Sequence, residues 1–349
     1  MSIYIISNRA IIKDKGTERF NPNGQEKASH NFRIAEYDAD LKDYTIFPDR
    51  SAVDYSDVAT GQTKKQSDAL TGTGRLFFDL FKQLSSSKQR ADVLVFIHGF
   101  NYDLNANLEH IEQLKKAYLD RTNCTIEHLV YVSWPSLGRM WKYTDDQPDA
   151  IDTGAILGRA FRKVHQFYVD MFDSGNHEPC RQRIHLAAHS MGNQVMHHFA
   201  AQLGETPFPL FNEILLLNAD CDYDLFEPGK AFTHLHKLCE RVHIYINQED
   251  DALLVSQGTK NKKQRMGRKG PSNLHDLPAN VIIMDTTGAG QRRDDIALRE
   301  RVGDHWGYLE RKPVRDDIIQ VLAGTDEDDI PRRKVWDANP RYFYLPNGK

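Results

Sequence analysis

From residue 91 onward, short apolar runs of strand length alternate with longer amphipathic stretches, and this alternation constrains the fold more than any other feature. Strand-length runs separated by helical stretches are typical of βα units, in which helices connect parallel strands. Most of the runs are apolar on both faces, as parallel strands covered by helices require. The sequence therefore predicts an α/β fold with a mostly parallel central sheet and helices on both faces.

Hydrophobic periodicity places the expected elements along the chain. The expected strands cover residues 3–7, 32–36, 93–97, 129–133, 184–188, 214–218, 242–246 and 281–284. The expected helices cover residues 70–84, 108–119, 150–172, 192–203, 230–238 and 314–322. We expect one α/β domain over 70–323, preceded by a β-rich segment (1–69) of the same sheet. A C-terminal extension (324–349) follows, and its aromatic side chains are expected to pack against the domain.

Composition excludes several classes of protein. The net charge of −4 is small and neither half of the chain is strongly basic, whereas nucleic-acid-binding proteins usually carry a large basic face. No run approaches the roughly 18 apolar residues of a membrane span, and the N-terminus lacks the features of a signal peptide. The four cysteines form no CxxC pair, as expected for reduced thiols. We therefore expect a soluble cytoplasmic protein with no nucleic-acid partner and no membrane span.

The segment 184–196, IHLAAHSMGNQVM, places a serine where an expected strand meets an expected helix. A nucleophile elbow is a sharp turn of this kind, which lifts a serine hydroxyl above the sheet and needs small neighbours two residues away. Gly192 is one such neighbour, and Ala188 adds only a methyl group at the other position. The alternative for Ser190 is a helix N-cap. Its place inside a parallel sheet favours a nucleophile.

A serine hydroxyl becomes an effective nucleophile when a base removes its proton. After a nucleophile elbow, the acid comes next in the chain and the histidine last. Of the 15 histidines, His305 alone lies beyond the last expected parallel strand. The sequence therefore predicts His305 as the general base. No set of histidines has the spacing of metal ligands, because the two rings of an HxH pair on a helix point apart, so no metal site is expected.

Carboxylates follow the two strands that precede the histidine. Asp250 comes after the strand at 242–246, and Asp220 comes after the strand at 214–218. Both positions lie at the carboxyl edge of the sheet, where open α/β folds bind their ligands. The later strand is the commoner place for an acid that orients the imidazole, so Asp250 is the first choice and Asp220 the second. The alternative for each carboxylate is a loop cap or a solvated side chain.

An oxyanion hole needs two backbone N–H groups that point at the developing negative charge. Met191, which follows the nucleophile, is expected to supply one of them. The other is expected from the turn after the strand at 93–97, where the chain reads HGFN. The glycine lets the backbone approach the substrate, which makes the N–H of Phe100 the expected second donor. The alternative is a simple turn at the end of a strand.

Four motifs together resemble a bacterial α/β-hydrolase family, a domain of unknown function with esterase- or lipase-like descriptions. They are VFIHGFN (95–101), VSWPSLG (132–138), AHSMGN (188–193) and YINQEDDAL (245–253). The resemblance covers about residues 70–310, including QRMG at 264–267 and the loop of His305. It implies an α/β-hydrolase fold with Ser190 as nucleophile, Asp250 as acid and His305 as base. The chain departs from the family pattern at Ala188, where glycine is usual.

A basic loop lies between Asp250 and the last expected parallel strand, near the same edge of the sheet. Two interpretations stay open: a site for an anionic substrate, a phosphate group or an acidic partner, and a solvated surface, which most charge runs are. Its basic side chains are Lys260, Lys262, Lys263, Arg265, Arg268 and Lys269.

Taken together, these residues predict a serine hydrolase that cleaves a carboxylic ester of a small-molecule or lipid substrate. Ser190 attacks the acyl carbonyl, and water then releases the acyl enzyme, without a metal or an organic cofactor. Amide and thioester substrates would use the same groups. Two alternatives stay open, an acyltransferase with the same triad and a non-catalytic binding module on a hydrolase scaffold.

Overall fold

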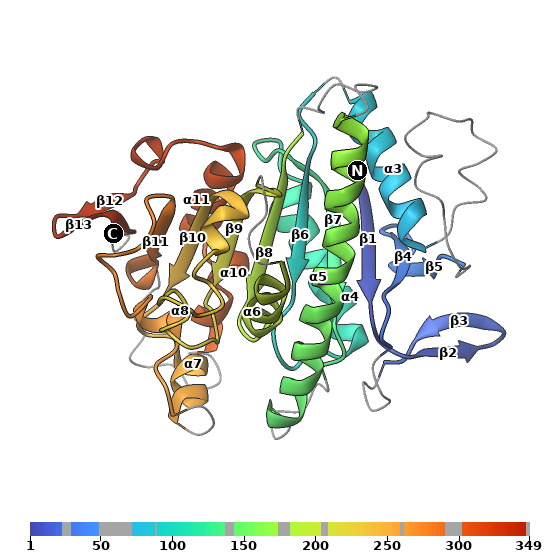
Figure 1. Cartoon of the computed structure of the whole chain (residues 1–349), viewed down its shortest axis with the longest axis horizontal. Helices are drawn as coiled ribbons and strands as arrows, with labels where there is room; N and C mark the ends of the chain where they lie inside the picture. Colours follow the sequence, from blue (N-terminus) through green and yellow to red (C-terminus); the bar gives the residue numbers. More distant parts are fainter. Residues whose placement is uncertain are drawn as a thin grey trace.

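The computed structural model describes residues 1–22, 29–48, 72–87, 89–136, 143–173, 182–203, 209–258, 262–289 and 302–346. These residues form an 11-stranded sheet and a small sheet in which β2 (Ile11–Asp14) pairs with β3 (Thr17–Phe20) (Figure 1). The strands of the large sheet, in spatial order, are β12 (Lys334–Trp336), β13 (Asn339–Tyr344), β11 (Val281–Asp285), β10 (Cys239–Ile246), β9 (Phe211–Leu217), β8 (Ile184–His189), β6 (Asp92–Ile97), β7 (Ile126–Ser133), β1 (Ser2–Ser7), β4 (Arg33–Asp38) and β5 (Asp43–Ile46).

Most of the large sheet is parallel. Every neighbouring pair from β13 across to β1 is parallel. The antiparallel pairs lie at the two ends of the sheet, where β12 pairs with β13, β1 pairs with β4, and β4 pairs with β5. Each expected strand is present, with ends that differ by at most three residues from those predicted. The predicted fold class, a mostly parallel α/β sheet, is therefore confirmed.

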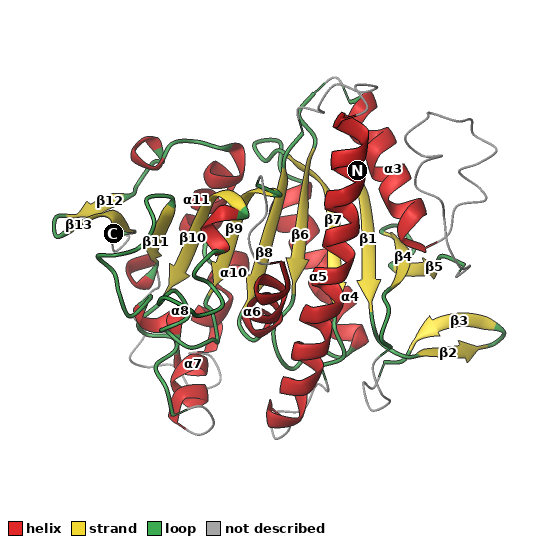
Figure 2. Ribbon diagram, in the orientation of Figure 1, coloured by secondary structure: helices red, strands yellow, loops and turns green. Residues whose placement is uncertain are grey.

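Helices cover both faces of the sheet, as Figure 2 shows. On one face lie α3 (Gly72–Ser86), α5 (Tyr143–Asp173) and α6 (Gly192–Leu203). On the other lie α4 (Leu104–Leu114), which continues as a π-helical turn (Lys115–Leu119), α10 (Gly307–Glu310) and α11 (Lys312–Ala323). Two short helices, α7 (Asp251–Ser256) and α8 (Met266–Lys269), follow β10. None of the described helices combines the length and the hydropathy needed to cross a bilayer.

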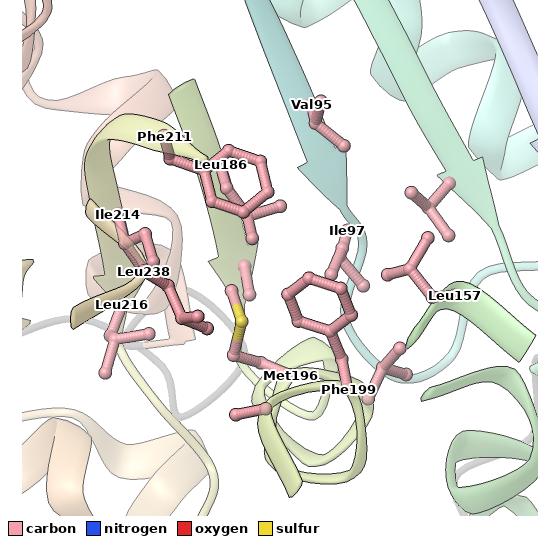
Figure 3. Packing of buried hydrophobic residues seen from close by; sticks show 14 of the residues in the cluster. Val95, Ile97, Leu157, Leu186, Met196, Phe199, Phe211, Ile214, Leu216 and Leu238 are labelled. Atoms are coloured by element: carbon pink, nitrogen blue, oxygen red, sulfur yellow. The ribbon is translucent and has the colours of Figure 1, made fainter. Parts of the chain in front are cut away.

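Burial on both faces of the sheet explains why the central strands are apolar at every position. In β6, Val95 and Ile97 belong to the core that contains Phe199 of α6 (Figure 3). The intervening residues Leu94 and Phe96 belong to the core on the opposite face. Because successive side chains of a strand point to opposite faces, a strand buried between two helical layers must be apolar throughout.

The prediction of a helix at 230–238 is wrong. This segment consists of turns and ends in a short 3-10 helix (Leu235–Lys237). The backbone N–H of Phe232 donates to the carbonyl of Leu225, seven residues earlier, which an α-helix does not allow. Phe232 and Leu238 are both buried. The apolar spacing that predicted a helix therefore reflects core contacts made by an irregular segment.

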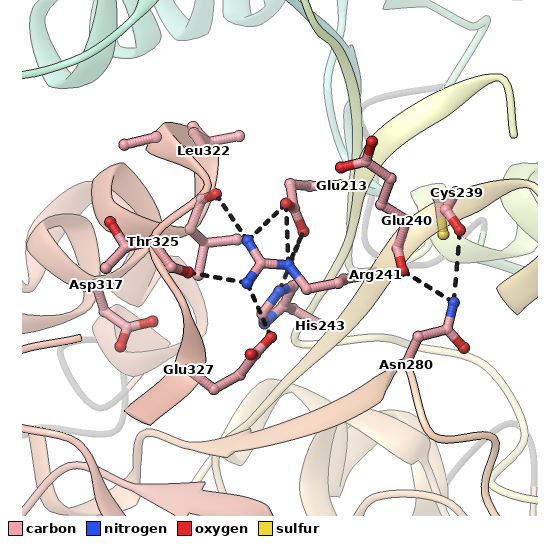
Figure 4. A network of polar contacts seen from close by, with 12 residues as sticks. Glu213, Cys239, Glu240, Arg241, His243, Asn280, Asp317, Leu322, Thr325 and Glu327 are labelled. Atoms are coloured by element: carbon pink, nitrogen blue, oxygen red, sulfur yellow. Dashed lines mark hydrogen bonds and ion pairs between the residues drawn. The ribbon is translucent and has the colours of Figure 1, made fainter. Parts of the chain in front are cut away.

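The C-terminal segment extends the sheet, because β13 pairs in parallel with β11. A polar network joins this segment to the amino ends of β9 and β10 (Figure 4). In it, the Arg241 guanidinium bonds the carboxylate of Glu213 (N–O 2.7 Å), the carboxylate of Glu327 (2.9 Å) and the carbonyl of Thr325 (2.8 Å). The buried charge of Glu213 is thereby paired, as stability requires.

Candidate active site

Ser190 lies in the sharp turn between β8 and α6, and its backbone is strained. Its φ angle is +52°, in the left-handed region that residues other than glycine rarely adopt. Two residues later, a Cβ atom on Gly192 would lie 2.6 Å from the carbonyl oxygen of His98 and 2.7 Å from that of Ile97. Because these atoms are backbone, α6 can approach the end of β6 only with glycine at this position.

Hydrogen bonds hold this strained turn. The N–H of Ser190 donates to the carbonyl of Leu217 (3.0 Å), and the Ser190 carbonyl accepts from the N–H groups of Asn193 and Asp220 (3.0 Å each). The Asn193 side chain also donates to the carbonyl of Ala188 (2.9 Å). Asn193 was not among the predicted site residues, although it is the last residue of the AHSMGN motif.

Asp250 and His305, 55 residues apart in the chain, meet at the carboxyl edge of the sheet. The distance between Nδ1 of His305 and Oδ2 of Asp250 is 2.7 Å. Asp250 caps the N-terminus of α7, where its Oδ1 accepts from the N–H of Leu253 (3.0 Å). The side-chain amide of Asn218 donates to Oδ2 (2.8 Å). Three donors thus hold the carboxylate in one orientation.

The pair shifts both pKa values. Burial by itself raises the pKa of Asp250, but the charge of His305 and the hydrogen bonds to the carboxylate outweigh it and hold the pKa below its usual range. For His305, burial lowers the pKa, but the charge and hydrogen bond of Asp250 outweigh it and raise the pKa. Since Nδ1 of the ring donates to Asp250, Nε2 is the nitrogen left to accept a proton.

The second-choice acid, Asp220, has different partners. Its carboxylate accepts from the hydroxyl of Ser256 (2.9 and 3.0 Å) and from Nε of Arg265 (2.7 Å). Arg265 is fully buried and also pairs with Asp222 (2.6 Å). Asp220 therefore neutralises a buried arginine, and its charge also raises the pKa of the His305 imidazole.

The loop after β6 packs directly against Ser190. A Cβ atom on Gly99 would lie 3.0 Å from Cβ of Ser190 and 3.2 Å from Nδ1 of His189. Phe100 is the next residue in this loop, and Met191 directly follows Ser190 in the chain. The two predicted oxyanion donors are therefore chain neighbours of Gly99, which packs against Ser190, and of Ser190 itself.

His189, which the sequence reasoning did not select, supports the loop of His305. Its Nε2 donates to the carbonyl of His305 (2.9 Å), and the two ring centroids are 4.6 Å apart. Burial and the nearby charge of His305 hold the pKa of His189 well below its usual value. The ring is therefore neutral, and it anchors the histidine loop to the residue that precedes Ser190.

The basic loop is largely engaged with the protein itself, apart from Lys260, which lies outside the described residues. Lys263 pairs with Asp222 (3.2 Å) and Asp224 (3.4 Å), and Arg268 donates to the carbonyl of Gln248 (2.7 Å). Arg265 is also paired, and Lys262, Lys263 and Lys269 are the exposed members among the described residues. An anion site on this loop stays a prediction. Within the described ranges, no group of three or more potential ligand side chains could hold a metal ion.

A strained serine between a parallel strand and a helix, with a histidine supplied from a later loop at the carboxyl edge of the sheet, characterises the α/β-hydrolases. Residues 78–281 match the family described as "Alpha/beta hydrolase of unknown function (DUF900)", and the chain belongs to this family. It is also similar to "Uncharacterized protein alr1448" of Nostoc sp., with 21% identity over 269 residues. That similarity covers 62% of this chain and 65% of the relative.

Proposed function

We propose that this protein is a serine hydrolase that cleaves a carboxylic ester through an acyl enzyme. The observation that carries the proposal is the buried Asp250–His305 pair, whose contact through Nδ1 leaves Nε2 as the proton acceptor. The strained turn at Ser190 is the second support, because backbone strain of this kind persists where function requires it.

In the proposed reaction, Oγ of Ser190 attacks the ester carbonyl carbon while its proton passes to Nε2 of His305. The carbonyl electron pair moves to the oxygen, and the N–H groups of Phe100 and Met191 stabilise the resulting charge. The tetrahedral intermediate collapses, and the alcohol leaves with the proton from His305. Water then attacks the acyl enzyme with His305 again as base, and the acid product leaves Ser190 with its hydroxyl restored. Asp250 keeps the proton on Nδ1 and stabilises the imidazolium.

Cellular location is part of the same proposal. Cys124, Cys221 and Cys239 are free thiols, two of them buried, and free thiols are usual in the reducing cytoplasm. We therefore place this hydrolase in the cytoplasm.

A fluorophosphonate probe and a series of nitrophenyl esters of increasing acyl length test the proposal. We expect one adduct on Ser190, and Ser190→Ala should lose labelling and turnover while its thermal melt stays close to that of the wild type. Ser272→Ala is a matched control, because Ser272 is exposed and its hydroxyl donates to the carboxylate of Glu227; it should behave like the wild type. Turnover retained in Ser190→Ala would refute the nucleophile assignment, and a wild type without label or turnover would favour a binding module.

A further inference from the structure

Arg9 lies two residues after the end of β1 and outside the residues that match the hydrolase family. Its side chain nevertheless contacts loops at the edge of the sheet where the proposed catalytic residues lie. In Figure 1, β1 lies beside β7, and β7 lies beside β6. The Nη2 group of Arg9 donates to the carbonyl of Tyr102 after β6 (2.8 Å) and to that of Trp134 after β7 (2.9 Å). Its Nε donates to the hydroxyl of Ser133 (3.2 Å). One guanidinium therefore joins the two loops.

Arg9 is a buried cation whose hydrogen-bond acceptors are neutral. Its side chain is 1% exposed, and it forms no ion pair within the described part of the chain. Burial lowers the pKa of Arg9 to about 10, so the group still carries its charge at neutral pH. Burying a charge without a carboxylate in direct contact costs stability, although the charges of Asp103 and Asp146 act on Arg9 from a longer range and raise its pKa. What the guanidinium supplies in return is a set of donors from one planar group, which an apolar side chain could not offer to the carbonyls of the two loops.

From Trp134, contacts continue to the loop that adjoins the nucleophile. The indole Nε1 of Trp134 donates to the carbonyl of His98 (2.8 Å), and its backbone N–H donates to Nε2 of His98 (3.1 Å). The two rings are stacked, with centroids 5.2 Å apart and planes 9° apart. Because Nε2 accepts, Nδ1 of His98 carries the proton, and it donates to the carbonyl of Gly99 (2.7 Å).

This last bond determines where the N–H of Phe100 points. The carbonyl of Gly99 and the N–H of Phe100 belong to one planar peptide group, in which they point in opposite directions. When His98 holds the carbonyl, the N–H of Phe100 must therefore point away from His98. The next peptide is also held, because the N–H of Asn101 donates to the hydroxyl of Ser136 (3.0 Å).

We propose that Arg9 is a positioning residue for the oxyanion donor Phe100. By bonding the carbonyls of Tyr102 and Trp134 together, Arg9 keeps the Trp134 ring stacked on and hydrogen-bonded to His98. His98 in turn fixes the orientation of the Gly99–Phe100 peptide, which presents the Phe100 N–H. The N-terminal strand β1 is thereby part of the catalytic unit. This inference rests on the proposed hydrolase function.

The test compares Arg9→Lys with Arg333→Lys in the full-length protein, using the nitrophenyl esters. Lysine keeps the charge but cannot bond the same acceptors from one planar group. We expect Arg9→Lys to lower kcat about 10- to 100-fold, because small displacements of an oxyanion donor have effects of this size, with KM changed less than about threefold. Arg333 is a matched control, since its side chain is equally buried and pairs with Asp317; Arg333→Lys should keep wild-type kcat. Unchanged kcat in Arg9→Lys, or an equal loss in Arg333→Lys, overturns the inference.

A second readout does not depend on activity. The hydrogen exchange rate of the Trp134 indole N–H, assigned in NMR spectra with Trp134→Phe, should rise in Arg9→Lys and stay unchanged in Arg333→Lys. If the wild type neither turns over esters nor labels at Ser190, the proposed function fails. The exchange rate then tests on its own whether Arg9 holds Trp134 in place, and an unchanged rate in Arg9→Lys overturns that role.

If Arg9→Lys does not fold, Ser133→Ala is tested in its place, because it removes the acceptor of Arg9 Nε. Wild-type kcat together with a wild-type exchange rate in Ser133→Ala would overturn the inference.

Discussion

Replacing Asp250 with asparagine changes the charge and the hydrogen bonding of the proposed acid but hardly its shape. Oδ2 of Asp250 faces two donors, Nδ1 of His305 (2.7 Å) and the amide of Asn218 (2.8 Å), and Oδ1 faces the N–H of Leu253 (3.0 Å). A carboxylate accepts all three bonds, whereas an amide has one accepting oxygen and one donating NH2 group. The asparagine must therefore turn its NH2 group toward a donor in either orientation.

Both orientations impair the base. With NH2 toward His305, the imidazole has to accept at Nδ1, so its proton moves to Nε2 and the ring cannot take the proton of Ser190. With NH2 toward Leu253, the helix cap is lost, and the neutral amide no longer stabilises the imidazolium. Coulomb attraction across 2.7 Å at an effective dielectric constant of about 20 is about 6 kcal/mol. This corresponds to about four orders of magnitude in rate, and the same substitution in a serine protease had an effect of that size.

We therefore expect Asp250→Asn to lower kcat/KM for a nitrophenyl ester about 10⁴-fold. Asp220→Asn is the matched control, and we expect it to keep most activity but to lose about 1–3 kcal/mol of unfolding free energy, because buried Arg265 loses one of its two charged partners and keeps Asp222. Ester hydrolysis and thermal melts of both variants separate the two effects. Activity of Asp250→Asn within tenfold of the wild type would refute the reasoning, and an inactive Asp220→Asn beside an active Asp250→Asn would move the acid to the loop after β9.

Two further predictions follow from the same geometry. Because His305 acts as a base only when it is deprotonated, kcat/KM should rise with pH, and because Asp250 raises its pKa, the midpoint should lie above the usual histidine value. In Asp250→Asn the midpoint of any residual activity should move to lower pH, and a pH profile with an unmoved midpoint would contradict the pairing. Gly192→Ala places a Cβ atom 2.6 Å from a backbone carbonyl oxygen, so urea unfolding should show a loss of about 1–3 kcal/mol together with reduced turnover; a variant as stable as the wild type would contradict the close packing of α6 on β6.

Features that depend on near neighbours in the chain could be predicted from the sequence. Apolar runs of strand length predicted the parallel sheet, because a strand buried on both faces has no polar position. The sharp turn at Ser190 could also be predicted, because a serine between a strand and a helix with glycine two residues later is a local pattern. Chain order alone selected His305 as the candidate base, and in the structure Nδ1 of its ring lies 2.7 Å from the carboxylate of Asp250.

Chain position ranked Asp250 ahead of Asp220 but could not exclude Asp220. Asp220 and Asp250 both follow parallel strands, and only the packing of Arg265 against Asp220 and of His305 against Asp250 distinguishes them. The helix expected at 230–238 failed for a related reason, because apolar spacing does not show whether backbone groups bond within the segment or elsewhere.

What the sequence by itself determined was the α/β fold class, the serine turn and the histidine, because each follows from periodicity, local turn chemistry or the order of elements along one chain. Tertiary structure alone decided which carboxylate meets the histidine and brought Arg9 to loops more than 90 residues away. The physical reason is that a hydrogen bond acts over about 3 Å. Which distant groups come within that distance depends on how strands and loops pack, and nothing in the local sequence around Arg9 records it.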